Sequence, residues 1–327
     1  HYALWLQREH PDIYDAVVRN AESHSLPVPA LRDLYPSPVP SELHNTTWLA
    51  DRFCDYLERR DGEQPFFAFV GFPDPHHPFT PPYNVLERFE GIEVRDPFDP
   101  TGEAVEGTPL GSAGTDLSGM TMAERRTIIR YTYAMAHQID LAVGRMVDGL
   151  KQAGLWDDTI VVFTSDHGDF LGDHARLRKG YTPSDALLHL PFIMRAPGAD
   201  LPSRVNMPMS NVDVLPTVLA MTGVEAPAWI HGVDIAEVLS QGREHTVLAY
   251  CSNGQPEVTN YTLYDDRYRF TLYPHSGYVE LFDHQEDLGE VNNLAEEAPE
   301  RVDRMRRVIE SRLLLHRNPI LARVSAW

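Results

Sequence analysis

Residues 159–169 read TIVVFTSDHGD, an apolar and β-branched run that passes directly into a polar, acidic turn. Such a run predicts a strand that is buried on both faces. A helix is expected before it at residues 122–154, because Thr121 and Glu124 have the spacing of a capping box and Gly154 suits the end. This succession of helix and strand is typical of an α/β fold.

The alternation continues on both sides of this stretch. Further helices are expected at residues 46–60, 211–222 and 299–315. Short strands are expected at residues 65–71, 191–194, 246–250, 261–264, 268–273 and 279–282. We therefore predict an α/β fold with a mostly parallel mixed sheet flanked by helices. Residues 1–243 would belong to this α/β domain, and residues 244–327 would form a small antiparallel sheet-plus-helix subdomain.

The charge of the chain bears on which kinds of molecule it binds. The chain has 48 acidic and 28 basic residues and a formal net charge of −20, whereas nucleic-acid-binding proteins usually carry a basic surface. No nucleic-acid partner is therefore expected, and an anionic substrate would need a local positive site. No apolar run is long enough for a transmembrane segment. We expect a soluble protein, but its localisation, cytoplasmic or exported, stays unknown, because no leader can be seen or excluded before His1.

A long stretch rich in Pro, Gly and Asp covers residues 80–118 and shows little periodicity. We interpret it as a surface insertion, and loops of this length often shape a binding site.

The candidate chemistry begins where the strand at residues 159–163 ends. Ligands of open α/β sheets bind at the carboxyl ends of strands, and Asp166 and His167 follow that end. With further carboxylates they can hold a divalent cation, and Lys179 downstream can pair with an anionic ester. The alternatives are that Asp166 caps a turn, His167 is incidental and Lys179 is a solvated surface residue.

A second cluster follows the strand expected at residues 65–71. Prolines flank His76 and His77 in the sequence FPDPHHPF, residues 72–79, and fix the backbone around both imidazoles. This arrangement favours a functional pair of histidines, although proline-rich turns also carry histidines without a role.

These segments together resemble the sulfatase family of the alkaline phosphatase superfamily. The matching segments run in the family's order over nearly the whole chain from about Ser41. They are residues 65–79, the D-x-x-V-G at 140–144, residues 154–180, the P-F-I at 191–193, the N-x-D-x-x-P-T at 211–217, the L-F-D at 281–283 and the E-x-N-N-L-A at 290–295. The resemblance implies an α/β sulfatase-like catalytic domain.

The resemblance also implies roles for individual residues. Asp166 and His167 would be ligands of one divalent cation, with Ca²⁺ the first candidate and Mn²⁺ or Zn²⁺ as alternatives. His76 would contact the sulfate and the leaving-group oxygen, and Lys179 would bind the sulfate or assist departure. The expected substrate-binding residues are His77, His174 and His44.

The family's nucleophile is a formylglycine made from Cys or Ser in a Cys-x-Pro-Ser-Arg or Cys-x-Ala-x-Arg context. Neither Cys54 nor Cys251 lies in such a context. We therefore expect the formylglycine in an N-terminal segment that is missing from this chain, and we expect this chain to be inactive without it.

The expected function is the hydrolysis of sulfate esters, with a sulfated small molecule or carbohydrate as the partner. Two alternatives stay open. A phosphonate monoester or phosphodiester hydrolase of the same superfamily needs similar stabilisation of a tetrahedral anion. A non-catalytic binder of sulfated glycans would lack the nucleophile altogether.

Overall fold

The computed structural model describes residues 1–23, 33–62 and 64–315 of the chain. These residues form two compact units. The first comprises His1–Pro97 and Leu117–Thr159, and the second comprises Phe98–Asp116 and Ile160–Trp327. The division predicted between residues 243 and 244 stays a prediction. Within the described residues, no helix combines the length and apolar character that crossing a bilayer requires.

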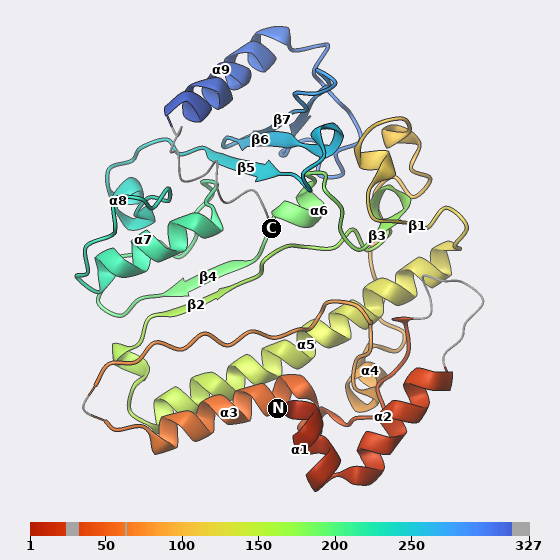
Figure 1. Ribbon diagram of the computed structural model, residues 1–327, viewed down its shortest axis with the longest axis vertical. Coiled ribbons are helices and arrows are strands. Elements are labelled where there is room, and N and C mark those ends of the chain that lie inside the picture. The colour runs from red at the N-terminus through yellow and green to blue at the C-terminus, as the bar shows by residue number, and fades with distance from the viewer. Residues whose placement is uncertain (24–32, 63, 316–327) are drawn as a thin grey trace. The chain divides into compact units, whose positions relative to one another are not determined.

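The first unit is built from helices (Figure 1). They are α1 (Tyr2–Glu9), α2 (Pro11–Ser23), α3 (Asn45–Arg59), α4 (Tyr83–Leu86) and α5 (Met122–Gln152). The predicted helices at 46–60 and 122–154 are confirmed as α3 and α5. The α5 capping box is present, because Thr121 Oγ1 accepts from Glu124 N and the Glu124 carboxylate accepts from Thr121 N.

Helices α3 and α5 lie side by side and run in the same direction (Figure 1). Gln138 on α5 is fully buried and donates to Thr47 on α3 at 2.7 Å. Near the other end, a Cβ added at Gly149 would lie 2.9 Å from the Sγ of Cys54. The absence of a side chain at Gly149 therefore allows the close approach of the two helices.

The strand predicted at residues 65–71 is not formed. These residues have no regular secondary structure, and the side chains of Phe67 and Phe69 are each 87% exposed. A strand exists only where a neighbouring strand receives its hydrogen bonds. Among the described residues no strand pairs with this segment.

The second unit contains the strands and four further helices of the described residues. The strands are β1 (Thr115–Asp116), β2 (Val161–Thr164), β3 (Arg176–Leu177), β4 (Phe192–Arg195), β5 (Val247–Cys251), β6 (Asn260–Tyr264), β7 (Tyr268–Leu272) and β8 (Val279–Asp283). The helices are α6 (Asp185–Leu188), α7 (Asn211–Met221), α8 (Ile235–Ser240) and α9 (Pro299–Leu315). The other predicted helices and strands are thus confirmed to within two residues.

The strand pairs of the described residues are antiparallel: β1 with β3, β2 with β4, and the sheet β5-β6-β7-β8. The small C-terminal antiparallel sheet is confirmed, and the predicted mostly parallel sheet stays a prediction. Strand β2 is only partly buried, not buried on both faces as predicted, because β4 is its one partner among the residues that the structure describes. Helix α9 packs on the C-terminal sheet, where Val302, Met305 and Ile309 meet Leu263, Phe270 and Leu281 (Figure 1).

Residues 80–118 are mostly exposed or partly exposed, as expected for a surface insertion, but part of the segment reaches the core. Val105, Leu110 and Ala113 are buried and form a core cluster with Phe170 and Leu187. Isolated apolar residues in a Pro- and Gly-rich stretch give no periodic signal, so their burial depends on tertiary packing.

Candidate functional site

The end of β2 is fixed by a side chain from the start of α7. Asn211 donates from Nδ2 to the carbonyl oxygen of Ser165 at 2.9 Å, and its Oδ1 accepts from the hydroxyl of Thr164 at 3.2 Å. Ser165 in turn donates its hydroxyl to the carbonyl oxygen of His167 at 3.0 Å. The turn that carries Asp166 and His167 is therefore held on its strand by side chains as well as by its backbone.

The imidazole of His167 has a defined tautomer. Its Nδ1 lies 2.8 Å from the carbonyl oxygen of Gly168, so Nδ1 carries the proton and donates it. Nε2 is then an acceptor, and the Nζ of Lys179 lies 2.5 Å from it. Lys179 is one of only two lysines in the chain. The structure thus brings the predicted residues His167 and Lys179 together.

The loop between these two residues returns on itself. Asp169 Oδ1 accepts from the backbone N–H of Arg178 at 2.8 Å and from that of Leu171 at 3.0 Å. Phe170 N donates to the Arg178 carbonyl at 3.0 Å. These bonds close residues 169–178 into a loop and place Lys179 beside His167.

The backbone at Gly168 is packed against α6. Its N–H donates to the carbonyl oxygen of Leu187 at 2.8 Å. A Cβ at this position would lie 2.0 Å from the carbonyl oxygen of Ala186, so only glycine fits here.

Asp166 is an exposed carboxylate next to these groups. Its Oδ1 accepts from the backbone N–H of His167 at 2.9 Å. Desolvation is the largest single influence and opposes ionisation. The hydrogen bond from His167 and the positive charge of Lys179 act in the other direction, and the pKa of Asp166 lies below its usual value. Asp166 is therefore an anion at neutral pH.

Asp166 and His167 fit part of a cation site. Asp166 Oδ2 lies 3.5 Å from His167 Nε2, so an anionic oxygen and a ring nitrogen lie close together. The lone pair of this nitrogen accepts from Lys179, so a cation bound there would replace that hydrogen bond. A backbone carbonyl that accepts from Nδ1–H is the usual support of a metal-ligating histidine. The described residues contain no group of three or more His, Cys, Asp or Glu side chains placed to hold a metal. They therefore supply two donors, and a cation would need further ligands.

His76 and His77 belong to the first unit. Their rings are stacked with centroids 4.0 Å apart, and His76 Nδ1 lies 2.7 Å from the carbonyl oxygen of His77. His76, like His167, is thereby set to donate from Nδ1 and to present Nε2. Its side chain is exposed, as a residue that meets a substrate must be.

His44 is buried in the first unit and caps α3, because its Nδ1 accepts from the N–H of Thr46 at 3.4 Å. Asp74 lies beside it, with Oδ2 at 3.5 Å from the same nitrogen, and Asp74 also accepts from the Thr46 hydroxyl. Burial is the main influence on His44 and lowers its pKa, although Asp74 opposes this. These contacts favour a role in fixing the loop that begins at Asp74.

His174 is buried in the second unit and paired with a carboxylate. Its Nδ1 lies 3.3 Å from the Oδ2 of Asp99, and its backbone N–H donates to the Phe98 carbonyl at 2.8 Å. Asp173 adds a bond from Phe98 N to its Oδ1 at 2.8 Å. These bonds tie residues 98–99 to the loop before Lys179 and favour a structural role, so substrate binding by His174 and His44 stays a prediction.

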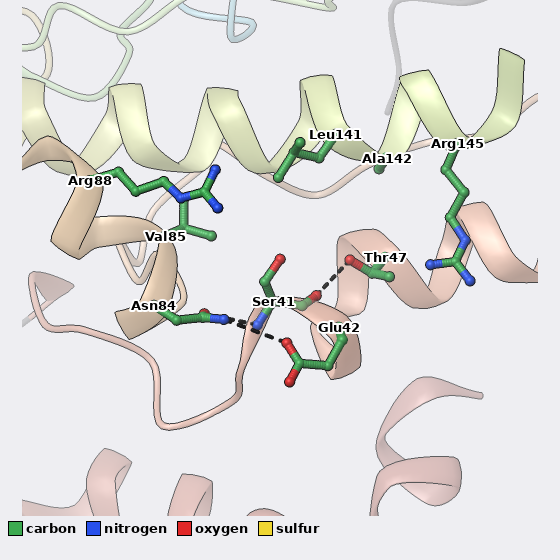
Figure 2. Close-up of a pocket in the computed structure, with 9 residues that line it drawn as sticks. All are labelled: Ser41, Glu42, Thr47, Asn84, Val85, Arg88, Leu141, Ala142 and Arg145. Atoms are coloured by element: carbon green, nitrogen blue, oxygen red, sulfur yellow. Dashed lines mark hydrogen bonds between the residues drawn. The ribbon is translucent and has the colours of Figure 1, made fainter. Parts of the chain in front are cut away.

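A pocket of about 260 Å³ lies elsewhere in the first unit, between residues 41–47, α4 and α5. Figure 2 shows Arg88 and Arg145 on opposite sides of the pocket, with Glu42 between them. None of the predicted site residues lines it.

The sequence interpretation gave no role to Asn211 or Asp169 in holding the site. Asn211 was part of a recognised motif, and a polar residue at a helix start next to a strand end is a usable signal. Asp169 gave no signal of its own, because its partner Arg178 is defined only by the fold of the loop.

Two protein-family models and several curated relatives match this chain. The sulfatase family model matches residues 9–224, and the model of the C-terminal part of N-sulphoglucosamine sulphohydrolase matches residues 172–318. An arylsulfatase of Clostridium perfringens is 28% identical over 280 residues, which cover 82% of this chain and 57% of the relative. The multifunctional alkaline phosphatase superfamily protein PehA of Trinickia caryophylli is 33% identical over 228 residues, which cover 64% of this chain and 44% of the relative.

The chain thus spans about half the length of these curated relatives. Among solved structures, the phosphonate monoester hydrolase of Agrobacterium radiobacter has a TM-score of 0.76 at 22% identity, covering 96% of this chain and 69% of that one. This likeness supports the α/β fold and, at that identity, nothing further. The sulfatase model, however, matches more than half of the chain and ends only beyond the turn at Asp166 and the loop to Lys179. The chain therefore belongs to the sulfatase family.

Proposed function

We propose that the protein hydrolyses sulfate esters in a metal- and formylglycine-dependent reaction. This chain would contribute Asp166, His167, Lys179 and His76 to the active site. The observation that carries the proposal is the cluster at the end of β2. There the ammonium of Lys179 lies 2.5 Å from His167 Nε2, and a carboxylate oxygen of Asp166 lies 3.5 Å from the same nitrogen.

Lys179 would stabilise the reacting group. Its ammonium is exposed and lies beside His167, so it can pair with the oxygens of a sulfuryl group as their negative charge grows. Asp166 and His167 would hold the divalent cation, for which Ca²⁺ is our first candidate. A bound cation supplies Lewis-acid stabilisation of the same oxygens.

His76 would serve the leaving group. With Nδ1 directed at the His77 carbonyl, Nε2 is the atom available to carry the proton that a departing alkoxide oxygen takes up. His77 stacks on His76 and would line the substrate site beside it.

The nucleophile would lie outside these 327 residues. Both cysteines of the chain lack the sequence context in which formylglycine is formed. In the family, formylglycine supplies the hydroxyl that attacks sulfur, and we expect this group in another segment of the full-length protein.

The substrate would be a sulfated small molecule or a sulfated carbohydrate. The match of residues 172–318 to the C-terminal part of an N-sulphoglucosamine sulphohydrolase supports a sugar. The resemblance to PehA, a multifunctional protein of the alkaline phosphatase superfamily, supports a second candidate, hydrolysis of a phosphonate monoester or a phosphodiester.

Rates on matched aryl esters separate these candidates. The whole protein encoded by the gene would be purified with Ca²⁺, Mn²⁺ or Zn²⁺. It would then be assayed on 4-nitrophenyl sulfate and on 4-nitrophenyl phenylphosphonate. We expect a larger kcat/KM on the sulfate. A larger value on the phosphonate would favour the second candidate, and no turnover of either ester with any of the metals would contradict both.

A further inference from the structure

The C-terminal sheet carries a buried charge cluster on the side of β7. Arg269 is fully buried, and its Nη1 donates to Thr271 at 2.7 Å and to Glu280 at 3.2 Å. Its Nε donates to Oε1 of Glu290, which is 2% exposed. Buried charged side chains are stable only while each one is paired. Moving one member of this cluster would leave another buried charge without its partner, so the cluster holds its members in place.

The second carboxylate oxygen of Glu290 leaves the cluster and reaches α6. Oε2 accepts from the hydroxyl of Ser184 at 2.6 Å and from the backbone N–H of Asp185 at 3.0 Å. Ser184 is 1% exposed and also caps α6. One carboxylate therefore joins the C-terminal sheet to the start of α6.

Helix α6 is the surface on which the Asp166 turn rests. Leu187 N donates to the Ser184 carbonyl, and the Leu187 carbonyl accepts from Gly168 N at 2.8 Å. Gly168 is the residue whose carbonyl fixes the tautomer of His167. A continuous series of hydrogen bonds thus runs from Arg269 through Glu290 and Ser184 to the turn that carries His167.

We propose that Glu290 is a positioning residue of the active site. By accepting hydrogen bonds from Ser184 and Asp185, Glu290 fixes the position of α6. The position of α6 in turn fixes Gly168 and His167 relative to Lys179. This inference rests on the proposed function and assigns the C-terminal sheet a part in it. Groups that orient a metal-ligating histidine typically change affinity or activity by about 10–100-fold when they are removed.

The decisive variant is Ser184→Ala, which removes the hydroxyl that binds Glu290, together with its cap on the Ala186 N–H, and leaves the ion pair intact. We expect the Gly168 amide to exchange its hydrogen at least about tenfold faster, and kcat on 4-nitrophenyl sulfate to fall about 10–100-fold with little change in KM. The matched control is Thr262→Val, which removes another buried hydroxyl bond, Thr262 to Thr271 at 3.0 Å, within the same sheet.

Ser184→Ala loses two side-chain hydrogen bonds and Thr262→Val loses one, so urea unfolding should show a loss of stability in both variants. Ser184→Ala alone should expose Gly168 to exchange and lower kcat. Equal exchange at Gly168 in the two variants would overturn the proposal, as would a loss of exchange protection that follows global stability alone. The exchange measurement needs no substrate, so it reports on Glu290 even if the protein hydrolyses no sulfate ester.

Discussion

Asp169 and Arg178 are joined by a hydrogen bond of 2.8 Å from the Arg178 N–H to the Asp169 carboxylate, and this bond closes the loop that brings Lys179 back to His167. The contact between Lys179 and His167 in the second unit therefore depends on one short loop and on the residues that support it. The contacts that support this loop and the Asp166 turn can be removed one at a time by substitution.

Gly168→Ala should displace the Asp166 turn from α6. The new Cβ would lie 2.0 Å from the carbonyl oxygen of Ala186, the residue before Leu187, whose own carbonyl accepts from Gly168 N. We expect a loss of activity of about 100-fold or more, because an error of about 1 Å at a reacting group costs that much. The control is Gly144→Ala, where nothing lies within 4 Å of the added Cβ; activity should be unchanged and the helix slightly more stable. Equal activities of the two variants would contradict the packing argument.

Asn211→Ala should loosen the end of β2. It removes the bonds to the Ser165 carbonyl and the Thr164 hydroxyl, and Asn211 is exposed, so the free energy of unfolding should fall by only about 1 kcal/mol. Activity should fall about tenfold or more, since the change acts on the position of Asp166. Steady-state kinetics and urea unfolding measure the two effects, and an unchanged kcat would remove Asn211 from the account.

Thr46→Val tests the anchor of the loop that carries His76. The substitution keeps the shape of the side chain and removes the hydroxyl that binds Asp74. We expect kcat to fall, because the loop that carries His76 loses this anchor. Thr127→Val is the matched control, because its hydroxyl binds the Ala123 carbonyl within α5. If both variants keep the normal kcat, Asp74 has no influence on His76.

Asp213 should make stability depend on acid pH. It is 2% exposed, and it accepts from Ser210 N, Val233 N and His245 Nε2. Desolvation opposes its ionisation, but these hydrogen bonds outweigh it and lower the pKa of Asp213. A lowered pKa stabilises the fold at pH values above the usual value of about 4, and this contribution is lost as the pH falls through the folded-state value.

The check on Asp213 is a comparison of urea unfolding for the protein and for Asp213→Asn. At pH 7 the variant should be less stable by about 2 kcal/mol, and the difference should shrink below about pH 4. A difference that stays constant across this range would show that the charge of Asp213 does not contribute.

Local signals predicted most of the elements. The capping box at Thr121 and Glu124 located the start of α5, and alternation with turn residues located the strands of the C-terminal sheet. The segment at residues 65–71 was predicted from the same kind of signal and is not a strand, because strand formation requires a partner that local sequence does not specify.

The site was predictable only in part, for a similar reason. Asp166, His167 and Lys179 could be selected from motif order, and the structure places them together. The pairs His174–Asp99 and Glu290–Ser184 join residues 75 and 106 positions apart, so neither could be found from spacing. Burial of these groups, which decides between a structural and a substrate-binding role, is equally a tertiary property.

The central claim is that Lys179 stabilises the charge of the reacting sulfate ester at the end of β2. Lys151, the other lysine of the chain, is an exposed residue of α5 near Asp148 and provides the control. The measurement is kcat/KM of the gene-encoded protein on 4-nitrophenyl sulfate for Lys179→Ala and Lys151→Ala. Loss of one preorganised charge should lower the value about 100–1,000-fold for Lys179→Ala and leave Lys151→Ala unchanged. Equal values for the two variants would contradict the account.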